Sequence, residues 1–211
     1  LARCGADING FIGWAPFTLA AFKVNLEVMK LLAALGADVN VSSCHGTPLH
    51  LAVLGGLTDS IKALAALGAD MNANNTVVGR EGEVAPPPLH FAVEFGSLGE
   101  ITTMITHGAD VNGRDCDGST PLHISAEQGD DDVSSKAREG LVSLGAEVHV
   151  ANNSGKTPLS LAPVSHWYTA NLGVVLHIAA HCRHTYEGSD VQDHSLPSVQ
   201  FLLRQQVAMA V

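Results

Sequence analysis

Basic residues are scarce in this sequence, where 11 lysines and arginines stand against 21 aspartates and glutamates among 211 residues. The formal charge at pH 7 is therefore −10 with histidine counted as neutral. Affinity for a phosphate backbone begins with clustered cations, so this balance argues against a nucleic-acid partner. We expect the partner to be another protein, with a basic or apolar contact surface.

Long apolar runs and paired cysteines are also missing. No stretch approaches the roughly 18 to 20 consecutive apolar residues that cross a bilayer, and no basic segment followed by an apolar run opens the sequence. Scattered cysteines without paired spacing are typical of reduced thiols, and here they are Cys4, Cys44, Cys116 and Cys182. We therefore expect an intracellular protein, cytoplasmic or nuclear, without a membrane span.

What the chain does contain is an internal repeat with two recurring phrases. Thr-Pro-Leu-His stands at 47–50 and 120–123, with weaker copies at 15–18, 87–90 and 157–160. Gly-Ala-acid-apolar begins at Gly5, Gly36, Gly68, Gly108 and Gly145. In three copies the Pro of the first phrase lies 20 residues before the Gly of the second, namely Pro16 to Gly36, Pro48 to Gly68 and Pro88 to Gly108. This fixed spacing places both phrases in one repeating frame.

The local chemistry of one repeat predicts a pair of helices. The hydroxyl of Thr47 suits an N-cap, and Pro48 suits the first helical position, where no amide donor is needed. Gly56 turns the chain, and Gly68 ends the second helix in the left-handed conformation that glycine adopts without strain. The apolar residues at helical spacing are Leu49, Ala52 and Val53 in the first helix, and Ile61, Leu64 and Leu67 in the second.

The segment Thr47-Pro48-Leu49-His50-Leu51-Ala52 resembles the hallmark of the ankyrin repeat, and the resemblance covers about residues 1–162. It implies an all-α fold, a solenoid of stacked helix pairs with β-hairpin or turn fingers. It also implies partner binding along the fingers and the concave inner helices, with no cofactor. In such folds the histidine of the phrase bonds the threonine at the helix start. Pro87 replaces that threonine, so we expect His90 to lack this partner.

The frame divides the chain into repeats. We predict a partial repeat at 1–10, repeats at 11–40, 41–72, 73–112 and 113–149, and a fifth that starts at 150. The frame decays after residue 162, so 163–211 is either a degenerate repeat or the start of a following domain. Solenoids need polar terminal repeats, and both ends of this sequence are apolar, so we expect a larger polypeptide.

Two insertions interrupt the frame. Pro88 follows Gly68 by 20 positions, against 11 to 13 in the other copies, so the finger at 73–86 is longer. It either contacts a partner or is a neutral surface insertion. Four extra residues between Pro121 and Gly145 fall at 129–132, where three aspartates suit a solvated turn at a helix N-terminus better than a cation site.

Catalysis is not predicted, because no phosphate-binding loop, nucleophile elbow or metal-binding helix motif is present. The densest cluster of possible metal ligands is His177, His181, Cys182 and His184. The spacing of His177 and His181 suits two zinc ligands on one helix face. The position of His177 is already explained by the histidine of the repeat, so we expect no metal site and no enzyme.

Binding residues are predicted from the register of the repeat. In the fingers they are Val41, Ser43, His45, Asn75, Arg80, Glu81, Arg114 and Asp115. On the inner helices they are Phe22, Lys23, Leu54, Glu94, Phe95, Glu127 and Gln128. Aromatic residues are common interface anchors, so Phe22 and Phe95 are the main candidates, with packing against the preceding repeat as the alternative.

The leading hypothesis is a protein-protein interaction scaffold, and two alternatives stay open. The array is the regulatory or targeting arm of a larger enzyme or of a ubiquitin-ligase adaptor, or it is a substrate of an asparaginyl hydroxylase. The second alternative concerns Asn40 and Asn72, each of which has a leucine eight positions earlier. A structural asparagine in the finger turn explains the same residues.

Overall fold

The computed structural model describes residues 8–9, 15–43, 46–73, 76–78, 83–95, 97–128 and 132–161. The tail at 163–211, which includes the cluster around His177, lies outside them. The described helices are α1 (Pro16–Phe22), α2 (Leu26–Ala34), α3 (Pro48–Leu54), α4 (Thr58–Ala66), α5 (Pro88–Phe95), α6 (Leu98–Thr106), α7 (Pro121–Glu127), α8 (Asp132–Ser143) and α9 (Pro158–Leu161). The strands are β1 (Thr76–Val78) and β2 (Glu83–Ala85).

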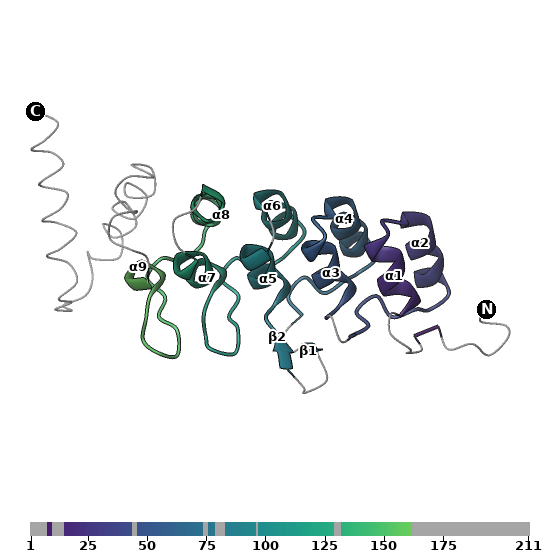
Figure 1. Cartoon of the computed structure of the whole chain (residues 1–211), viewed down its shortest axis with the longest axis horizontal. Helices are drawn as coiled ribbons and strands as arrows, with labels where there is room; N and C mark the ends of the chain where they lie inside the picture. Colours follow the sequence, from purple (N-terminus) through teal and green to yellow (C-terminus); the bar gives the residue numbers. More distant parts are fainter. Residues whose placement is uncertain are drawn as a thin grey trace, which may run out of the picture. The chain divides into compact units, whose positions relative to one another are not determined.

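The helices stack as antiparallel pairs in two layers (Figure 1). The inner layer contains α1, α3, α5, α7 and α9, each in contact with the next, and the outer layer contains α2, α4, α6 and α8. Large apolar side chains fill the space between the layers and between the pairs. They are fully buried at Phe17, Met29, Leu49, Ile61, Leu64, Ile101, Met104, Leu122 and Leu141. This arrangement confirms the predicted all-α solenoid, and the connections between pairs extend to one side as fingers (Figure 1).

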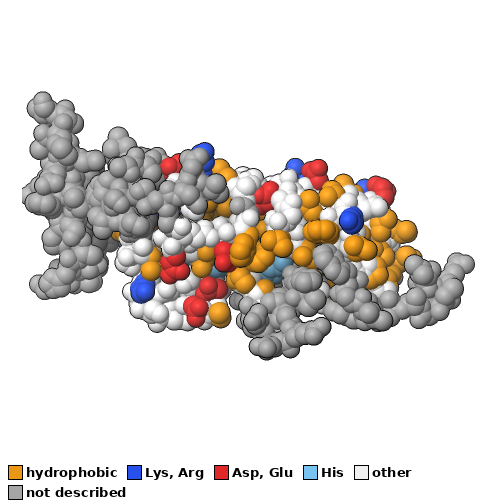
Figure 2. Space-filling model, in the orientation of Figure 1, with side chains coloured by type: hydrophobic (Ala, Val, Ile, Leu, Met, Phe, Trp, Pro, Cys, Tyr) orange, Lys and Arg blue, Asp and Glu red, His pale blue; other side chains and the backbone are white. Residues whose placement is uncertain are grey.

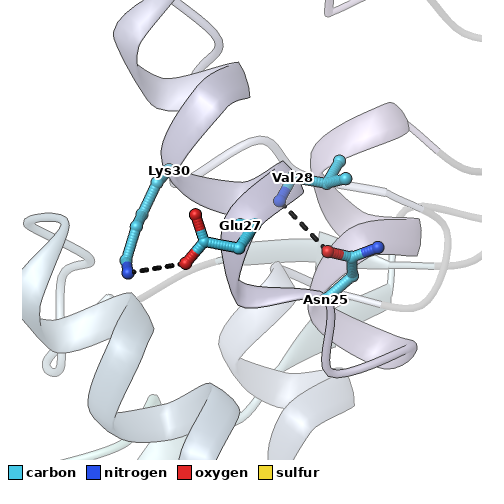
Figure 3. Close-up of polar contacts among 4 residues, drawn as sticks. All are labelled: Asn25, Glu27, Val28 and Lys30. Atoms are coloured by element: carbon cyan, nitrogen blue, oxygen red, sulfur yellow. Dashed lines mark hydrogen bonds and ion pairs between the residues drawn. The ribbon is translucent and has the colours of Figure 1, made fainter.

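Capping residues define where the helices begin. Proline is the first residue of every inner helix, as the Thr-Pro phrase predicts. Two outer helices, α2 and α6, use side-chain caps instead. Asn25 Oδ1 accepts a hydrogen bond of 3.1 Å from the backbone N–H of Val28, and Lys30 pairs with Glu27 one turn along the surface of α2 (Figure 3). At α6, the carboxylate of Glu100 accepts from the backbone N–H of Ser97 at 2.7 Å.

A ladder of asparagine side chains joins each repeat to the next. Each side-chain oxygen accepts from the backbone N–H of the acidic residue in the following Gly-Ala-acid phrase. The pairs are Asn9 with Asp38 at 2.8 Å, Asn40 with Asp70 at 2.8 Å, Asn72 with Asp110 at 2.7 Å and Asn112 with Glu147 at 2.8 Å. In two of these residues the amide group also donates to a glycine carbonyl, from Asn72 to Gly108 and from Asn112 to Gly145.

The two insertions lie partly among the described residues. In the long finger, β1 and β2 are antiparallel, and Thr76, Val77 and Val78 pair with Ala85, Val84 and Glu83 respectively. Of the second insertion, at 129–132, the structure describes Asp132, which is the first residue of α8. This position agrees with the expected acidic residue at a helix N-terminus. The helix α8 has 12 residues against nine in each of α2, α4 and α6.

The turn inside the first described pair contains a strained residue. Gly56 turns the chain between α3 and α4 with φ of +64°, and Val24 occupies the same slot between α1 and α2 with φ of +55°. A β-branched side chain is disfavoured in this left-handed region, whereas glycine adopts it freely.

We predict that Val24→Gly raises the free energy of unfolding by about 1 kcal/mol. Relief of left-handed strain contributes about 1–2 kcal/mol, and the greater flexibility of unfolded glycine offsets about 0.5–1 kcal/mol of it. Urea denaturation of the purified chain measures the change. Val24→Ala is the matched control, because alanine lacks the β-branch of valine but keeps a Cβ, and with it the strain of the left-handed conformation. A Val24→Gly variant no more stable than the alanine variant would contradict the prediction.

Candidate protein-interaction surface

Exposed apolar side chains lie at the C-terminal ends of the inner helices. Phe22 on α1, Leu54 on α3 and Phe95 on α5 have exposed fractions of 37%, 54% and 53%. They occupy the sixth or seventh position after the first proline of each helix, where the chain turns away from the core. Figure 2 shows hydrophobic side chains gathered over α3 and α5 and continuing toward α1. The contacts between these helices make these side chains neighbours across the stack.

The aromatic part of this surface rests on a buried histidine. The ring of Phe95 lies 4.7 Å from that of Phe91, measured between centroids, and Phe91 meets His50 edge-on at 5.5 Å. His50 is fully buried and Phe91 is half-buried. Aromatic pairs in these geometries add to the energy of simple burial, so Phe95 stands on a rigid support.

Charged and polar residues flank the apolar ones. The Lys23 ammonium lies 5.9 Å from the ring centroid of Phe22, within range of a cation–π interaction. Glu94 and Glu127 are exposed on α5 and α7. Gln128 donates from Nε2 to the carbonyl of Glu94 at 3.1 Å, which ties the end of α7 to that of α5. We use the term inner-helix surface for Phe22, Lys23, Leu54, Glu94, Phe95, Glu127 and Gln128.

Buried histidines hold the inner helices to the fingers. In the first such site, the backbone N–H of Thr47 donates to His50 Nδ1 at 3.2 Å, and His50 Nε2 lies 3.0 Å from the carbonyl of Pro86. Because an N–H group only donates, Nδ1 is the acceptor, and Nε2 carries the proton that bonds the next finger. The ring of His123 bonds Thr120 and the Lys156 carbonyl in the same way.

His90 makes only one of these two kinds of hydrogen bond, as the sequence predicts. Its Nε2 lies 2.8 Å from the carbonyl of Ser119, but Pro87 offers neither an N–H nor a hydroxyl. Among the described residues, His90 Nδ1 is a buried side-chain atom without a hydrogen-bond partner. Burial lowers the pKa of His90 from its ordinary value, and the carbonyl of Ser119 and the charge of Asp115 oppose this shift. Burial also lowers the pKa of His50, against the bond to Pro86.

The predicted finger residues have different surroundings. Val41 and Ser43 are buried, with exposed fractions of 7% and 4%, so the structure corrects their assignment as exposed contacts. Ser43 Oγ donates to the carbonyl of Gly46 at 2.8 Å, which closes the base of the finger and explains its burial. His45, Asn75, Arg80 and Glu81 lie outside the described residues.

The third finger contains the remaining predicted contacts. Arg114 is exposed, and its guanidinium donates to the carbonyl of Ala151 in the next finger at 3.2 Å. Asp115 is half-buried, and one carboxylate oxygen accepts from the backbone N–H groups of Asp117 and Ser119. Both residues therefore have structural roles, and of the two only Arg114 is exposed.

The described residues also bear on the expectations about asparagine hydroxylation, metal binding and membrane spans. Asn40 and Asn72 belong to the asparagine ladder, so a structural role accounts for both, and their hydroxylation stays a prediction. Within the described ranges, no group of three or more His, Cys, Asp or Glu side chains is placed to hold a metal ion. No described helix has the length and apolar character of a membrane span.

Sequence reasoning missed two groups of apolar residues. Phe91 supports Phe95 from the helix turn before it, and the i, i+4 spacing of the two rings was the available signal. Leu19, Val28, Leu31 and Leu35 are exposed at the N-terminal end of the described stack. In the next pair the slots of Leu19 and Val28 are filled by Leu51 and Ser60, both buried. Ser60 Oγ donates to the carbonyl of Ala21 on α1, in the preceding pair, so this side is where repeats stack.

The comparison with known families decides the identity of the array. A model described as ankyrin repeats, in three copies, matches residues 1–75 and 89–176. The chain belongs to the ankyrin-repeat family. The helix pairs and fingers are therefore those of an ankyrin array, a family whose members generally mediate contacts between proteins.

Curated ankyrin relatives match parts of the chain. Protein phosphatase 1 regulatory subunit 27 of Mus musculus is 40% identical over 73 residues, 35% of this chain and 45% of the relative. Nuclear factor NF-kappa-B p105 subunit of Gallus gallus is 31% identical over 159 residues, 69% of this chain and 15% of the relative. Ankyrin repeat and SOCS box protein 16 of Mus musculus is 35% identical over 161 residues, which are 74% of this chain and 34% of the relative. The matched region thus spans less than half the length of each relative.

We predict that Pro87→Thr stabilises the ankyrin array. The new threonine supplies an N–H and a hydroxyl to His90 Nδ1, as Thr47 does for His50, and one such bond contributes about 1 kcal/mol. Pro87→Val is the matched control, because valine has the shape of threonine and an N–H but no hydroxyl. Urea denaturation should rank the threonine variant above the valine variant by about 1 kcal/mol. Equal stabilities would contradict a role for the hydroxyl.

Proposed function

We propose that this ankyrin array is a protein-interaction scaffold that binds its partner through the inner-helix surface. The observation that supports this proposal is the exposure of Phe22, Leu54 and Phe95 on three neighbouring helices. Exposed apolar side chains grouped on a rigid surface mark interaction sites more often than single scattered ones do. Aromatic anchors of this kind account for a large part of the binding energy in protein interfaces.

The fingers extend the proposed contact. The hairpin β1–β2 projects beside the inner helices (Figure 1), and its length sets this finger apart from the others in the chain. Loops on a rigid scaffold often provide specificity, because they vary without cost to the core. We propose that the inner-helix surface provides the anchors and that the long finger contributes to the choice of partner.

The matched relatives agree with a regulatory role for the binding. One is named as a regulatory subunit of protein phosphatase 1 and another as a subunit of nuclear factor NF-kappa-B, and neither name describes a catalytic activity of the ankyrin segment. We therefore propose binding without catalysis for this array. The free and exposed thiol of Cys116 is consistent with an intracellular setting, cytoplasmic or nuclear.

The proposal predicts that Phe22→Ala and Phe95→Ala together abolish capture of the natural partner. Each truncation of a buried aromatic anchor typically costs more than about 1 kcal/mol of binding free energy, so the pair reduces affinity at least about tenfold. The immobilised chain is incubated with an extract of the cells that express it, and the captured proteins are compared by quantitative mass spectrometry. Circular dichroism confirms that both variants stay folded.

The matched control is Leu31→Ala. Leu31 is exposed to 58% on the outer helix α2, so its truncation removes similar apolar area from a face that is not proposed to bind. Proteins that bind the wild type and the Leu31→Ala variant, but not the double variant, are the expected partners. Equal capture by all three proteins would refute the proposed surface.

A second candidate is the targeting arm of a ubiquitin-ligase adaptor or of a larger enzyme. The supporting observation is the match over 74% of this chain to a protein whose name joins ankyrin repeats with a SOCS box. We predict that the full coding sequence then contains a further adaptor or catalytic domain beside the array. Sequencing the full-length transcript tests this candidate, and an array flanked only by further repeats would contradict it.

A further inference from the structure

The inner-helix surface changes chemistry along the stack. The sixth residue after the first proline of each inner helix is Phe22 on α1, Leu54 on α3, Glu94 on α5 and Glu127 on α7, and all four are exposed. These positions are equivalent in neighbouring helices, so they form one row. The row is apolar at the α1 end and acidic at the α7 end.

The seventh position adds a second row beside the first. It contains Lys23 on α1, Gly55 on α3, Phe95 on α5 and Gln128 on α7. The one cation of the inner-helix surface therefore lies at the α1 end, and both carboxylates lie toward the α7 end. Phe95 continues the apolar part of the surface as far as α5. In Figure 2, acidic side chains lie beside the hydrophobic group on its α7 side.

Glu94 and Glu127 have no ion-pair partner within the described part of the chain. The ion pairs that the structure shows there join Lys30 to Glu27 and Lys62 to Asp59, both on the outer helices. Two exposed carboxylates at equivalent positions of adjacent helices create a negative potential that favours cations. Lys23 has the opposite effect at the other end, because it repels a cation placed over Phe22.

We propose that the inner-helix surface binds a polarised peptide segment of the partner protein. Its apolar side chains contact Phe22, Leu54 and Phe95, and its lysine or arginine residues contact Glu94 and Glu127. The charge arrangement fixes the direction, with the basic end of the segment over α7. This inference rests on the proposed protein-binding function and assigns the chemistry of the bound segment.

The size of the surface sets the length of the segment. Packed helices lie about 8–10 Å apart, so the step from α1 to α7 is about 30 Å. An extended chain covers about 3.3 Å per residue, so about nine residues reach across the surface. A linear segment is therefore long enough to contact both the apolar and the acidic ends.

The test uses a display library of random peptides about 12 residues long, which exceeds the required span. The library is selected on the wild-type chain, on Phe22→Ala/Phe95→Ala and on Glu94→Lys/Glu127→Lys. The matched control is Glu27→Lys/Glu147→Lys, which makes the same change in net charge at exposed sites on an outer helix and a finger. Affinities of the enriched peptides are then measured by titration with purified protein.

Wild type and the charge control should select peptides with an apolar block and a separate lysine- or arginine-rich block. These peptides should bind the charge-reversed variant at least about tenfold more weakly, since like charges then face each other. The charge-reversed variant should select acidic residues in place of the basic block. Affinity for the wild type should also fall as the salt concentration rises.

Two results would overturn the inference. Peptides that require Phe22 and Phe95 but show no basic block, or that bind the charge-reversed variant equally well, would refute the polarised segment and leave the proposed surface in place. Failure of the wild type to enrich any peptide that depends on Phe22 and Phe95 would refute a linear-peptide site. Capture of the natural partner then decides the proposed function separately.

Discussion

Each helix pair in this array buries part of its apolar surface only by contact with neighbouring pairs, so the contact between repeats is the constraint on which the structure depends. Two sets of hydrogen bonds fix that contact at opposite ends of the repeat. Asparagines such as Asn72 join one finger turn to the next, and histidines such as His50 join an inner helix to the following finger. Both sets reach across repeats, which makes the stability of each repeat depend on its neighbours.

The histidines leave the C-terminal ends of the inner helices exposed. In α3, α5 and α7 the histidine lies two residues after the first proline, and the groups that these rings bond are backbone carbonyls and threonine. The sixth and seventh residues after that proline, such as Phe22 and Phe95, take no part in these bonds and are exposed. Their identity therefore changes from repeat to repeat at little cost to folding, and this freedom makes them suitable for recognition.

Much of the fold follows from the sequence because its signals are local. Thr47 and Pro48 start a helix, and Gly68 ends the next one, through conformational preferences that no neighbour overrides. The loss of one hydrogen bond at His90 was also predictable, because Pro87 removes the donor that the equivalent Thr47 supplies. The exposure of Phe22 and Phe95 followed from the register of the repeat, and their role as binding residues stays a prediction.

Other features depend on contacts that a single repeat does not reveal. Ser43 is buried, and its hydroxyl donates to the carbonyl of Gly46 across the turn of the finger. The length of α8, 12 residues against nine in α2, α4 and α6, was not predicted, because an aspartate such as Asp132 suits both a turn and a helix N-terminus. The conformation of Val24 was hidden for a different reason, since the frame places it in a glycine slot but valine signals no turn.

The first described repeat combines an exposed aromatic surface with a strained turn. At the end of α1 the sequence Phe22-Lys23-Val24 replaces the Leu54-Gly55-Gly56 of the next repeat. The replacement adds an aromatic ring and a cation to the exposed surface and puts a β-branched residue in a left-handed turn. The strain is about 1–2 kcal/mol, a cost that the interlocked repeats distribute over the stack. Strained backbone next to exposed binding groups is typical of functional sites, which further supports α1 as part of the recognition surface.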